Sequence, residues 1–317
     1  MKHFAIALAF LLTPLFAFAG EKVDKALDFI SGGYVDVSNV NGLVKVVPWD
    51  KNSVKISGEL SDNTKKFTFE RDGNRIHIKV EAKNLKNPFE KQSDTEGDNL
   101  LINLPAKSQL SYDTVNSEFI VDDLEGSLTA SSVNGKMEVS KCQNKIKLNS
   151  INGEIIAQKL QGVIKIETVN GKIHLRDSKA TELSLRTVNG EISANSSASE
   201  VKISAVSGNT QLQLGVVQEI DFSTVSGNAD IGLELSENGN INATTVSGDL
   251  TLRFSKDPSA YFDIDNAVGG DIVNQLSDDA VQQERYSPGK HLQFAHNKGN
   301  GKVKITSVSG TITLTNK

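Results

Sequence analysis

Apolar and polar residues alternate along most of the chain beyond residue 20. The segments 164–167 (Ile-Lys-Ile-Glu) and 172–175 (Lys-Ile-His-Leu) show the two-residue period of a strand with one buried face. Some helical spacing occurs only in residues 21–30, which fit either a short helix or a first capping strand. The pattern predicts an all-β protein.

A tripeptide made of a β-branched residue, Asn or Ser, and Gly recurs in the second half of the chain. The intervals between its successive glycines are 18, 18, 19, 18, 19 and 21 residues, and such regular spacing marks a repeat array. An imperfect copy occupies residues 115–117, and isolated copies occur at 40–42 and 308–310. The second and third residues of the regular copies are Asn134, Gly135, Asn152, Gly153, Asn170, Gly171, Asn189, Gly190, Ser207, Gly208, Ser226, Gly227, Ser247 and Gly248.

Two architectures accommodate this repeat. Asn-Gly between alternating strands is a strong hairpin signal, which would give an antiparallel meander or barrel. The alternative stacks the repeats in register as the coils of a parallel β-solenoid, and the regularity of the array favours it. Each coil would then hold two strands, a corner at the tripeptide and a second, looser corner.

Two further features favour the solenoid. In a two-residue hairpin the valine of each tripeptide would face away from the core, whereas at a solenoid corner we expect it to turn inward and fill the end of the core. The residues after the glycines, Lys136, Glu154, Lys172 and Glu191, alternate in charge, and stacking would place them about 4.8 Å apart in one column. We therefore predict a single-domain parallel β-solenoid with coils of 18–21 residues and corners at the tripeptides.

The Asn, Ser and Gly residues of these corners are expected to be structural. Rows of identical polar side chains can bind ligands, but the same residues are the usual formers of turns. Asn and Gly tolerate the left-handed backbone that a sharp corner needs, and stacked Asn side chains can satisfy one another in ladders.

The first residues have the layout of a secretory signal peptide. A basic start is followed by an apolar run that ends in a small-x-small site at residues 17–19. We predict cleavage after Ala19, export to the periplasm or cell surface of a bacterium, and no membrane span in the mature chain. The expected organisation is 1–19 signal peptide and 20–317 β-solenoid domain, divided into an N-terminal cap and irregular coils (20–110, with a polar loop at 84–99), regular repeats (111–255) and C-terminal coils (256–317, with a polar loop at 274–300).

Several segments carry a resemblance to a known family. They are residues 32–37 (GGYVDV), 46–50 (VVPWD), 54–58 (VKISG), 101–105 (LINLP) and 301–312 (GKVKITSVSGTI). Together with the repeats they resemble the bacterial "putative adhesin" family of exported β-strand-repeat proteins, over nearly the whole chain after the signal peptide. The resemblance implies a single β-solenoid domain and leaves the activity unassigned.

The composition offers little chemistry. Cys142 is the single cysteine, so no intramolecular disulfide can form, and the net charge of −5 is too small to steer a strongly charged partner such as nucleic acid. The chain has no Gly-x-Ser-x-Gly sequence, phosphate-binding loop or histidine-based zinc protease signature. We predict no catalytic residue and no cofactor.

Histidines and aspartates near the C-terminus are the candidates for a metal site. His291 and His296 match no zinc spacing. Asp263, Asp265 and Asp271 would suit calcium, but the glycine-and-aspartate repeat of calcium-binding β-rolls is missing. We therefore predict no tight metal and expect His291, His296 and Asp263 to be dispensable for folding.

The outward positions of the repeats bear on function. Parallel β-helices carry polysaccharide lyases and hydrolases, which need clustered acids or bases in a groove. Here these positions are mainly Ser, Thr, Asn and alternating Lys and Glu, with few aromatic residues to stack on sugars. We predict a non-catalytic, adhesin-like binding or structural protein, with a cell-surface glycan or an envelope protein as partner. The alternative is a carbohydrate-active enzyme on a β-helix scaffold.

Overall fold

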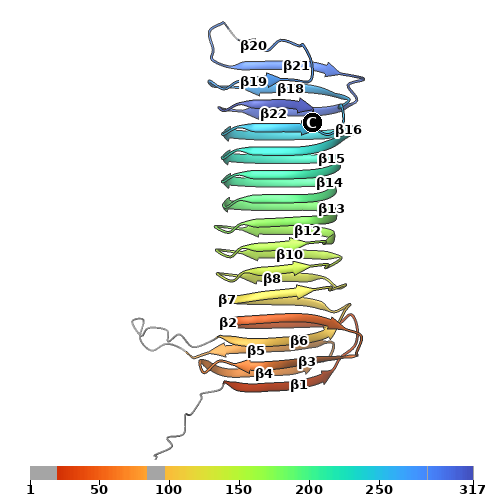
Figure 1. Cartoon of the computed structure of the whole chain (residues 1–317), viewed down its shortest axis with the longest axis vertical. Helices are drawn as coiled ribbons and strands as arrows, with labels where there is room; N and C mark the ends of the chain where they lie inside the picture. The colour runs from red at the N-terminus through yellow and green to blue at the C-terminus, as the bar shows by residue number, and fades with distance from the viewer. Residues whose placement is uncertain (1–19, 84–96, 284, 317) are drawn as a thin grey trace, which may run out of the picture.

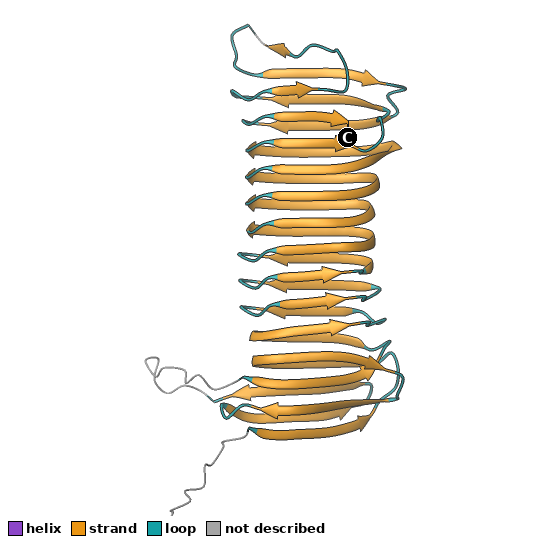
Figure 2. Ribbon diagram, viewed as in Figure 1, coloured by secondary structure: helices purple, strands orange, loops and turns teal. Residues whose placement is uncertain are grey.

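The computed structural model describes residues 20–83, 97–283 and 285–316. Every regular element in these ranges is a β-strand, and the strands stack into one long column (Figures 1 and 2). The all-β prediction is confirmed. The predicted signal peptide and most of the predicted polar loop 84–99 lie outside the described residues. In the part of the chain that the structure describes, no helix is long and apolar enough to cross a membrane.

The central coils pair in parallel and in register. Ile146 lies between Leu128 and Ile164, the residues 18 positions before and after it, and their neighbours keep the same offset. This β-solenoid-like stacking excludes an antiparallel meander for these coils. Their strands are β7 (Gln109–Asp122), β8 (Leu128–Ser132), β9 (Met137–Ser140), β10 (Lys145–Ser150), β11 (Ile155–Gln158), β12 (Gln161–Thr168), β13 (Ile173–Asn189), β14 (Ile192–Ser207), β15 (Thr210–Ser226), β16 (Ala229–Ser247) and β17 (Leu250–Phe254).

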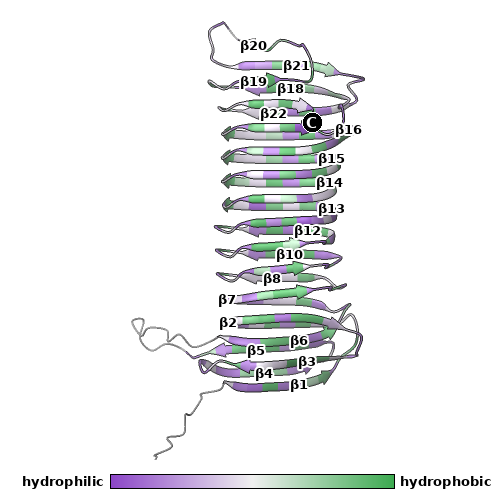
Figure 3. Cartoon of the chain, in the orientation of Figure 1, coloured by the Kyte–Doolittle hydropathy of each residue, from purple (hydrophilic) through white to green (hydrophobic). Residues whose placement is uncertain are grey.

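Alternation within each coil sends one side chain to the core and the next to solvent. Along β10, Ile146, Leu148 and Ser150 are buried, and the residues between them are partly exposed. Figure 3 shows this pattern as green and purple segments alternating along the strands. Burying an Ile or Leu side chain stabilises the fold by about 1.5–3 kcal/mol, and such rows recur in coil after coil. Packing therefore holds this fold together in place of disulfides.

Antiparallel strands close the N-terminal end. β2 pairs in parallel with β5, β6 and β7, but β4 with β5, β3 with β6, and β1 with β3 are antiparallel pairs. The wholly parallel arrangement predicted from the repeats does not extend to this cap. Residues 21–30, for which the sequence allowed a helix or a capping strand, contain the strand β1. Its sequence EKVDKALD is rich in charged residues, which disfavour edge pairing with another chain. The strands are β1 (Glu21–Asp28), β2 (Tyr34–Trp49), β3 (Ser53–Leu60), β4 (Thr64–Asp72), β5 (Arg75–Ala82) and β6 (Asp98–Pro105).

The C-terminal segment inserts into the column instead of extending it. β22 pairs in parallel with β16 on one side and β18 on the other, and β23 lies between β17 and β19. In Figure 1 the last strands of the chain accordingly lie between β16 and β18. The strands of this end are β18 (Ala260–Asn266), β19 (Ile272–Asn274), β20 (Gln282–Gln283), β21 (Lys290–His296), β22 (Gly301–Ser307) and β23 (Ile312–Asn316).

Residues 274–300, predicted as a polar loop, hold more structure than expected. β21 pairs antiparallel with β18, and the short β20 pairs with β21. Leu292 and Phe294 are buried, and the Phe294 ring stacks on Phe262 with 4.6 Å between the ring centroids. Leu292 and Phe294, two positions apart on β21, thus pack this strand over the end of the core.

The isolated tripeptides belong to the same corner as the regular copies. Residues 40–42 lie beside residues 115–117 through the pairing of β2 with β7. Val308 donates its backbone N–H to the carbonyl of Thr245, which places residues 308–310 on the last regular copy. The strands β3 to β6 of the cap separate the copy at 40–42 from the others in sequence, and β18 to β21, beyond the inserted coil, separate the copy at 308–310.

Candidate functional site

The β-branched residues of the tripeptides point away from the core. Ile151 is 44% exposed, Val169 39% and Val206 41%. The prediction that they fill the end of the core is wrong, because a hydroxyl residue takes that place one position earlier. Ser150 is buried and its Oγ accepts the backbone N–H of Gly153 at 2.8 Å. Strand alternation then turns Ile151 outward.

Stacking joins these side chains into one apolar stripe on the surface, which we call the valine column. At about 4.8 Å per coil, the seven steps between its eight members from residue 115 to residue 246 span roughly 34 Å. Contiguous exposed apolar surface of this kind marks interaction sites. The members are Val115, Val133, Ile151, Val169, Val188, Val206, Val225 and Val246.

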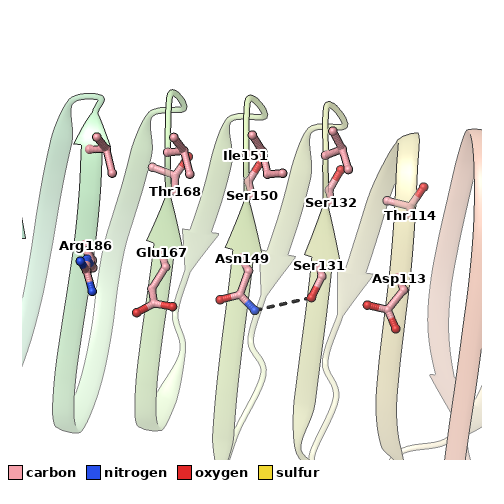
Figure 4. Close-up of a pocket in the computed structure, with 13 residues that line it drawn as sticks. Asp113, Thr114, Ser131, Ser132, Asn149, Ser150, Ile151, Glu167, Thr168 and Arg186 are labelled. Atoms are coloured by element: carbon pink, nitrogen blue, oxygen red, sulfur yellow. Dashed lines mark hydrogen bonds between the residues drawn. The ribbon is translucent and has the colours of Figure 1, made fainter.

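A groove of about 580 Å³ runs beside part of the valine column (Figure 4). One wall is apolar and comes from Val133, Ile151, Val169 and Val188. The other wall is polar and comes from the residues two positions earlier in each coil, namely Asp113, Ser131, Asn149, Glu167 and Arg186. Between the walls lie the hydroxyl residues of the corners, Thr114, Ser132, Ser150 and Thr168. The groove is therefore amphipathic across its width and repeats along its length.

The polar wall offers several kinds of hydrogen-bonding group. Asn149 Nδ2 donates to Ser131 Oγ at 3.5 Å, and Glu167 forms an ion pair with Lys165 at 3.0 Å. The two carboxylates of the groove, Asp113 and Glu167, are three coils apart, or roughly 14 Å. Paired carboxylates of glycoside hydrolases lie about 5–9.5 Å apart. The groove thus has polar groups for binding but no such pair.

The Asn residues of the corners form a hydrogen-bonded ladder next to the valine column. Asn134 Nδ2 donates to Asn116 Oδ1 at 2.7 Å, and Asn152 to Asn134 at 2.8 Å. Asn170 donates to Asn152 at 2.9 Å, and Asn189 to Asn170 at 3.0 Å. Each bond joins two neighbouring coils, so the ladder supports the stacking of these corners.

Close stacking requires glycine at both kinds of corner, and the Ser corners add a left-handed backbone. A Cβ on Gly208, Gly227 or Gly248 would lie 2.0, 2.2 or 2.3 Å from the carbonyl oxygen of the corner glycine on the neighbouring coil. In the Ser corners, Gly208, Gly227 and Gly248 have φ angles of +123°, +128° and +116°, the left-handed region expected from the sequence. In the Asn corners neither the Asn nor the Gly has a positive φ, so that reason is wrong there. These glycines are required by close stacking, because a Cβ on Gly153 would lie 2.0 Å from the carbonyl oxygen of Gly135.

Non-glycine residues adopt the left-handed conformation at the second corner of the coils. There φ is +66° at Asp123, +51° at Lys141, +54° at Lys159 and +48° at Asp177, which form one column, and Asn144 in the same corner as Lys141 has a φ of +68°. The sequence analysis did not find this column. Its spacing of 18 residues was visible, but two of its four members are Lys, which unlike Asp is not a typical turn residue.

The alternating charges lie in one column, as the sequence indicated. The residues after Lys136 and Glu154 donate their backbone N–H to the carbonyls of Glu154 and Lys172 on the next coil. Lys172 pairs with Glu191 at 3.4 Å, whereas Glu154 contacts His174 at 3.3 Å. Exposed pairs of this kind contribute about 0.2–1 kcal/mol each, so the column adds little to the stability of the fold.

Strand pairing at the C-terminal end gathers three residues from the list of metal candidates. Asp265 lies opposite His291 in the pairing of β18 with β21, and ligand atoms of Asp263, Asp265 and His291 all lie within 4.8 Å of one another. Asp271 is not part of this group and forms an ion pair with Lys290. Antiparallel pairing across a long connection concealed the cluster from an analysis of sequence spacing.

Cys142 has none of the features of a catalytic thiol. It is fully buried and unpaired, and its Sγ donates to the carbonyl of Ser140 at 3.3 Å. Burial raises the pKa of the thiol to about 12. Nucleophilic cysteines need the opposite shift, toward the thiolate.

Solved structures similar to this chain share little sequence with it. A "putative lipid binding protein" from Parabacteroides distasonis ATCC 8503 is 12% identical, with a TM-score of 0.45, and the match covers 93% of this chain and 97% of that one. A "putative adhesin" from Bacteroides fragilis NCTC 9343 is 14% identical, with a TM-score of 0.34 and coverage of 94% and 97%. A "putative cell adhesion protein" from Clostridium sporogenes ATCC 15579 is 10% identical, with a TM-score of 0.22 and coverage of 94% and 100%.

No curated protein matches the chain significantly in sequence. The family model Toastrack DUF4097 matches residues 35–315, well over half of the chain. This match agrees with the resemblance noted from the sequence, to a "putative adhesin" family of unassigned function. The chain belongs to the Toastrack DUF4097 family.

Proposed function

We propose that this chain is an exported, non-catalytic, adhesin-like protein that binds a linear glycan in the groove beside the valine column. The groove itself, with one apolar and one polar wall, is the observation that carries the proposal. The protein would act in the periplasm or at the cell surface of a bacterium. Residues 20–317 would form a single parallel β-solenoid domain, in which the corner Asn, Ser and Gly residues are structural.

The two walls of the groove suit the two faces of a sugar. Hydroxyl groups of a glycan would exchange hydrogen bonds with Ser131, Asn149 and Arg186, while its C–H faces would pack on Ile151 and the neighbouring valines. The walls repeat at the coil spacing of about 4.8 Å, which is close to the length of one sugar ring. A linear glycan along the column could therefore make the same contacts coil after coil.

The narrowness of the valine column favours a slender ligand over a folded protein. The column is one side chain wide and roughly 34 Å long. A stable protein interface buries about 800 Å² on each partner, which such a stripe reaches only with much of the polar surface around it. A single polymer chain fits the stripe without that requirement.

The arrangement of acids supports a binding role over the enzyme alternative. Glu182, Glu200 and Glu219 lie on adjacent coils, about 4.8 Å apart, a spacing near that of retaining glycoside hydrolases. This stack is the observation in favour of a carbohydrate-active enzyme. All three side chains are exposed, however, whereas a catalytic acid normally lies in shielded, apolar surroundings that raise its pKa.

Glycan binding by the mature protein tests the proposal. We expect linear glycans to be retained on a glycan array, and Ile151→Asp to weaken the affinity for the best of them at least about tenfold, since a charge would face the sugar. Asn149→Ala should weaken binding by a smaller factor. Val216→Asp is the matched control, because Val216 is 54% exposed and lies outside the groove.

Three outcomes would count against the proposal. Absence of binding to any linear glycan would refute the proposed ligand class. An equal loss of glycan affinity in Val216→Asp would refute the groove as the binding site. Release of oligosaccharide products from a glycan, if Glu200→Gln abolished it, would favour the carbohydrate-active enzyme over the binding protein.

The mature protein is proposed to begin at Gly20. The apolar run and the small-x-small site at residues 17–19 support this start. Mass spectrometry of the envelope or secreted fraction should give the mass of residues 20–317. Intact protein beginning at Met1 in that fraction would refute cleavage at this site.

A further inference from the structure

Two histidines of β21 each meet an aspartate, but in different surroundings. His296 Nε2 lies 2.8 Å from Asp257 Oδ1, and Asp257 also accepts hydrogen bonds from the amides of Asn297 at 3.0 Å and Asn316 at 3.2 Å. The amide donors, together with His296, lower the pKa of that carboxylate. This pair has the features of a structural contact, and no second carboxylate is grouped with it among the described residues.

The pair at the other end of β21 differs because a second carboxylate lies within reach. His291 Nδ1 is 2.6 Å from Asp265 Oδ1, and ligand atoms of His291, Asp265 and Asp263 all lie within 4.8 Å of one another. Gln293 Nε2 donates to Asp263 Oδ1 at 2.9 Å and so orients that carboxylate. The three side chains are half-buried on the antiparallel pair of β18 and β21, which fixes the spacing of their backbones.

This donor set matches a borderline divalent ion. Imidazole with carboxylates is a ligand set used by zinc and its first-row neighbours, whereas calcium takes oxygen ligands only. In a tetrahedral zinc site with bonds of about 2.0–2.2 Å, the ligand atoms lie about 3.3–3.6 Å apart, so atoms within 4.8 Å of one another would close in by at most about 1.5 Å. We propose that Asp263, Asp265 and His291 form a site for a divalent transition-metal ion, with zinc as the best fit.

The surrounding charges bear on the strength of the site. Lys304 on β22 lies beside Asp263 and offsets part of the negative charge. With three protein ligands and solvent access, the expected dissociation constant is micromolar.

A bound ion would join β18 to the covering strand β21. β21 follows a long irregular connection, and the chain has no disulfide to hold it in place. Cross-links that close long loops can stabilise the native state. The site would therefore secure the C-terminal cap, independently of ligand binding in the groove.

Calorimetric titration of the full mature chain, stripped with chelator, with zinc chloride alone tests this site. We expect about one ion per chain with micromolar affinity, and a melting temperature that rises with zinc. His291→Gln and Asp263→Asn should each weaken zinc binding at least about tenfold and abolish the rise. His296→Gln is the matched control on the same strand and should bind zinc as the wild type does.

The site would be refuted by no zinc binding up to about 1 mM, by calcium binding in place of zinc, or by unchanged zinc affinity in both His291→Gln and Asp263→Asn. An equal loss in His296→Gln would refute it too. Circular dichroism of each variant without metal establishes that it is folded. The two ligand variants lie on different strands, so a shared loss of zinc binding would not come from one common change in packing.

Discussion

Gly153→Ala is expected to destabilise the protein by about 3 kcal/mol, the upper end of the range for overpacking. A methyl group at this position would sit 2.0 Å from the carbonyl oxygen of Gly135 on the coil below and 2.8 Å from Ser150 Oγ. The carbonyl belongs to the backbone and cannot rotate away, so two coils must separate locally. The same Ser150 Oγ accepts the N–H of Gly153, and that hydrogen bond would be distorted as well.

Urea unfolding of purified wild type and variant measures this effect. Gly215→Ala is the control, since its new Cβ would lie 3.3 Å from a side-chain atom of Ser197 and its φ is not positive. We expect it to change the free energy of unfolding by less than about 1 kcal/mol, because Ala also restricts the unfolded chain. Equal effects of the two substitutions would contradict close stacking as the reason for the corner glycines.

Short-range patterns predicted the repeated part of the fold well. The alternation of residues such as Ile146 and Leu148 predicted the strands, and the regular tripeptides predicted stacked coils with a corner at each copy. Both features depend on contacts between neighbouring coils, which lie only 18–21 residues apart in sequence. The family resemblance combined these repeats with segments near both ends of the chain and is matched by the family model.

The orientation of the valine column was predicted wrongly although the sequence contained the answer. Ile146, Leu148 and Ser150 face inward by simple alternation, and the same period puts Ile151 outside. The error was to assume that an apolar residue at a corner must be buried. A buried serine completes the core there because its hydroxyl is paired with the backbone of Gly153. The groove, and with it the candidate site, depends on this reversal.

Features at the two ends depend on long-range pairing and were not accessible from local patterns. β22 inserts between β16 and β18, and β21 covers β18 across the long connection. The alternation of apolar and polar residues in these strands would be the same with other pairing partners, so it does not predict which strands pair. The cluster of Asp263, Asp265 and His291 exists only because of the second pairing. Sequence spacing alone could not bring these residues together.

Alkaline pH is expected to destabilise the protein through two buried acids. Burial raises the pKa of Cys142 from 9.0 to about 12 and that of Tyr112 from 10.0 to about 12. The folded state therefore retains protons that the unfolded state has already released. Stability is fully present below about pH 9 and falls as the pH rises, by up to about 1.4 kcal/mol per pH unit for each group, until the folded-state pKa is passed.

The Cys142 contribution appears first and can be isolated. Between about pH 8 and pH 10 its expected loss is about 1.4 kcal/mol, approaching about 4 kcal/mol near pH 12, while Tyr112 contributes mainly above about pH 10. Urea unfolding under reducing conditions should show this fall in the wild type and a flatter profile in Cys142→Ala, whatever that variant costs at neutral pH. Tyr112→Phe should keep the early fall and lose the later one. Exposed lysine pairs titrate alike in all three proteins, so identical profiles for wild type and Cys142→Ala would mean that the thiol is not buried as described.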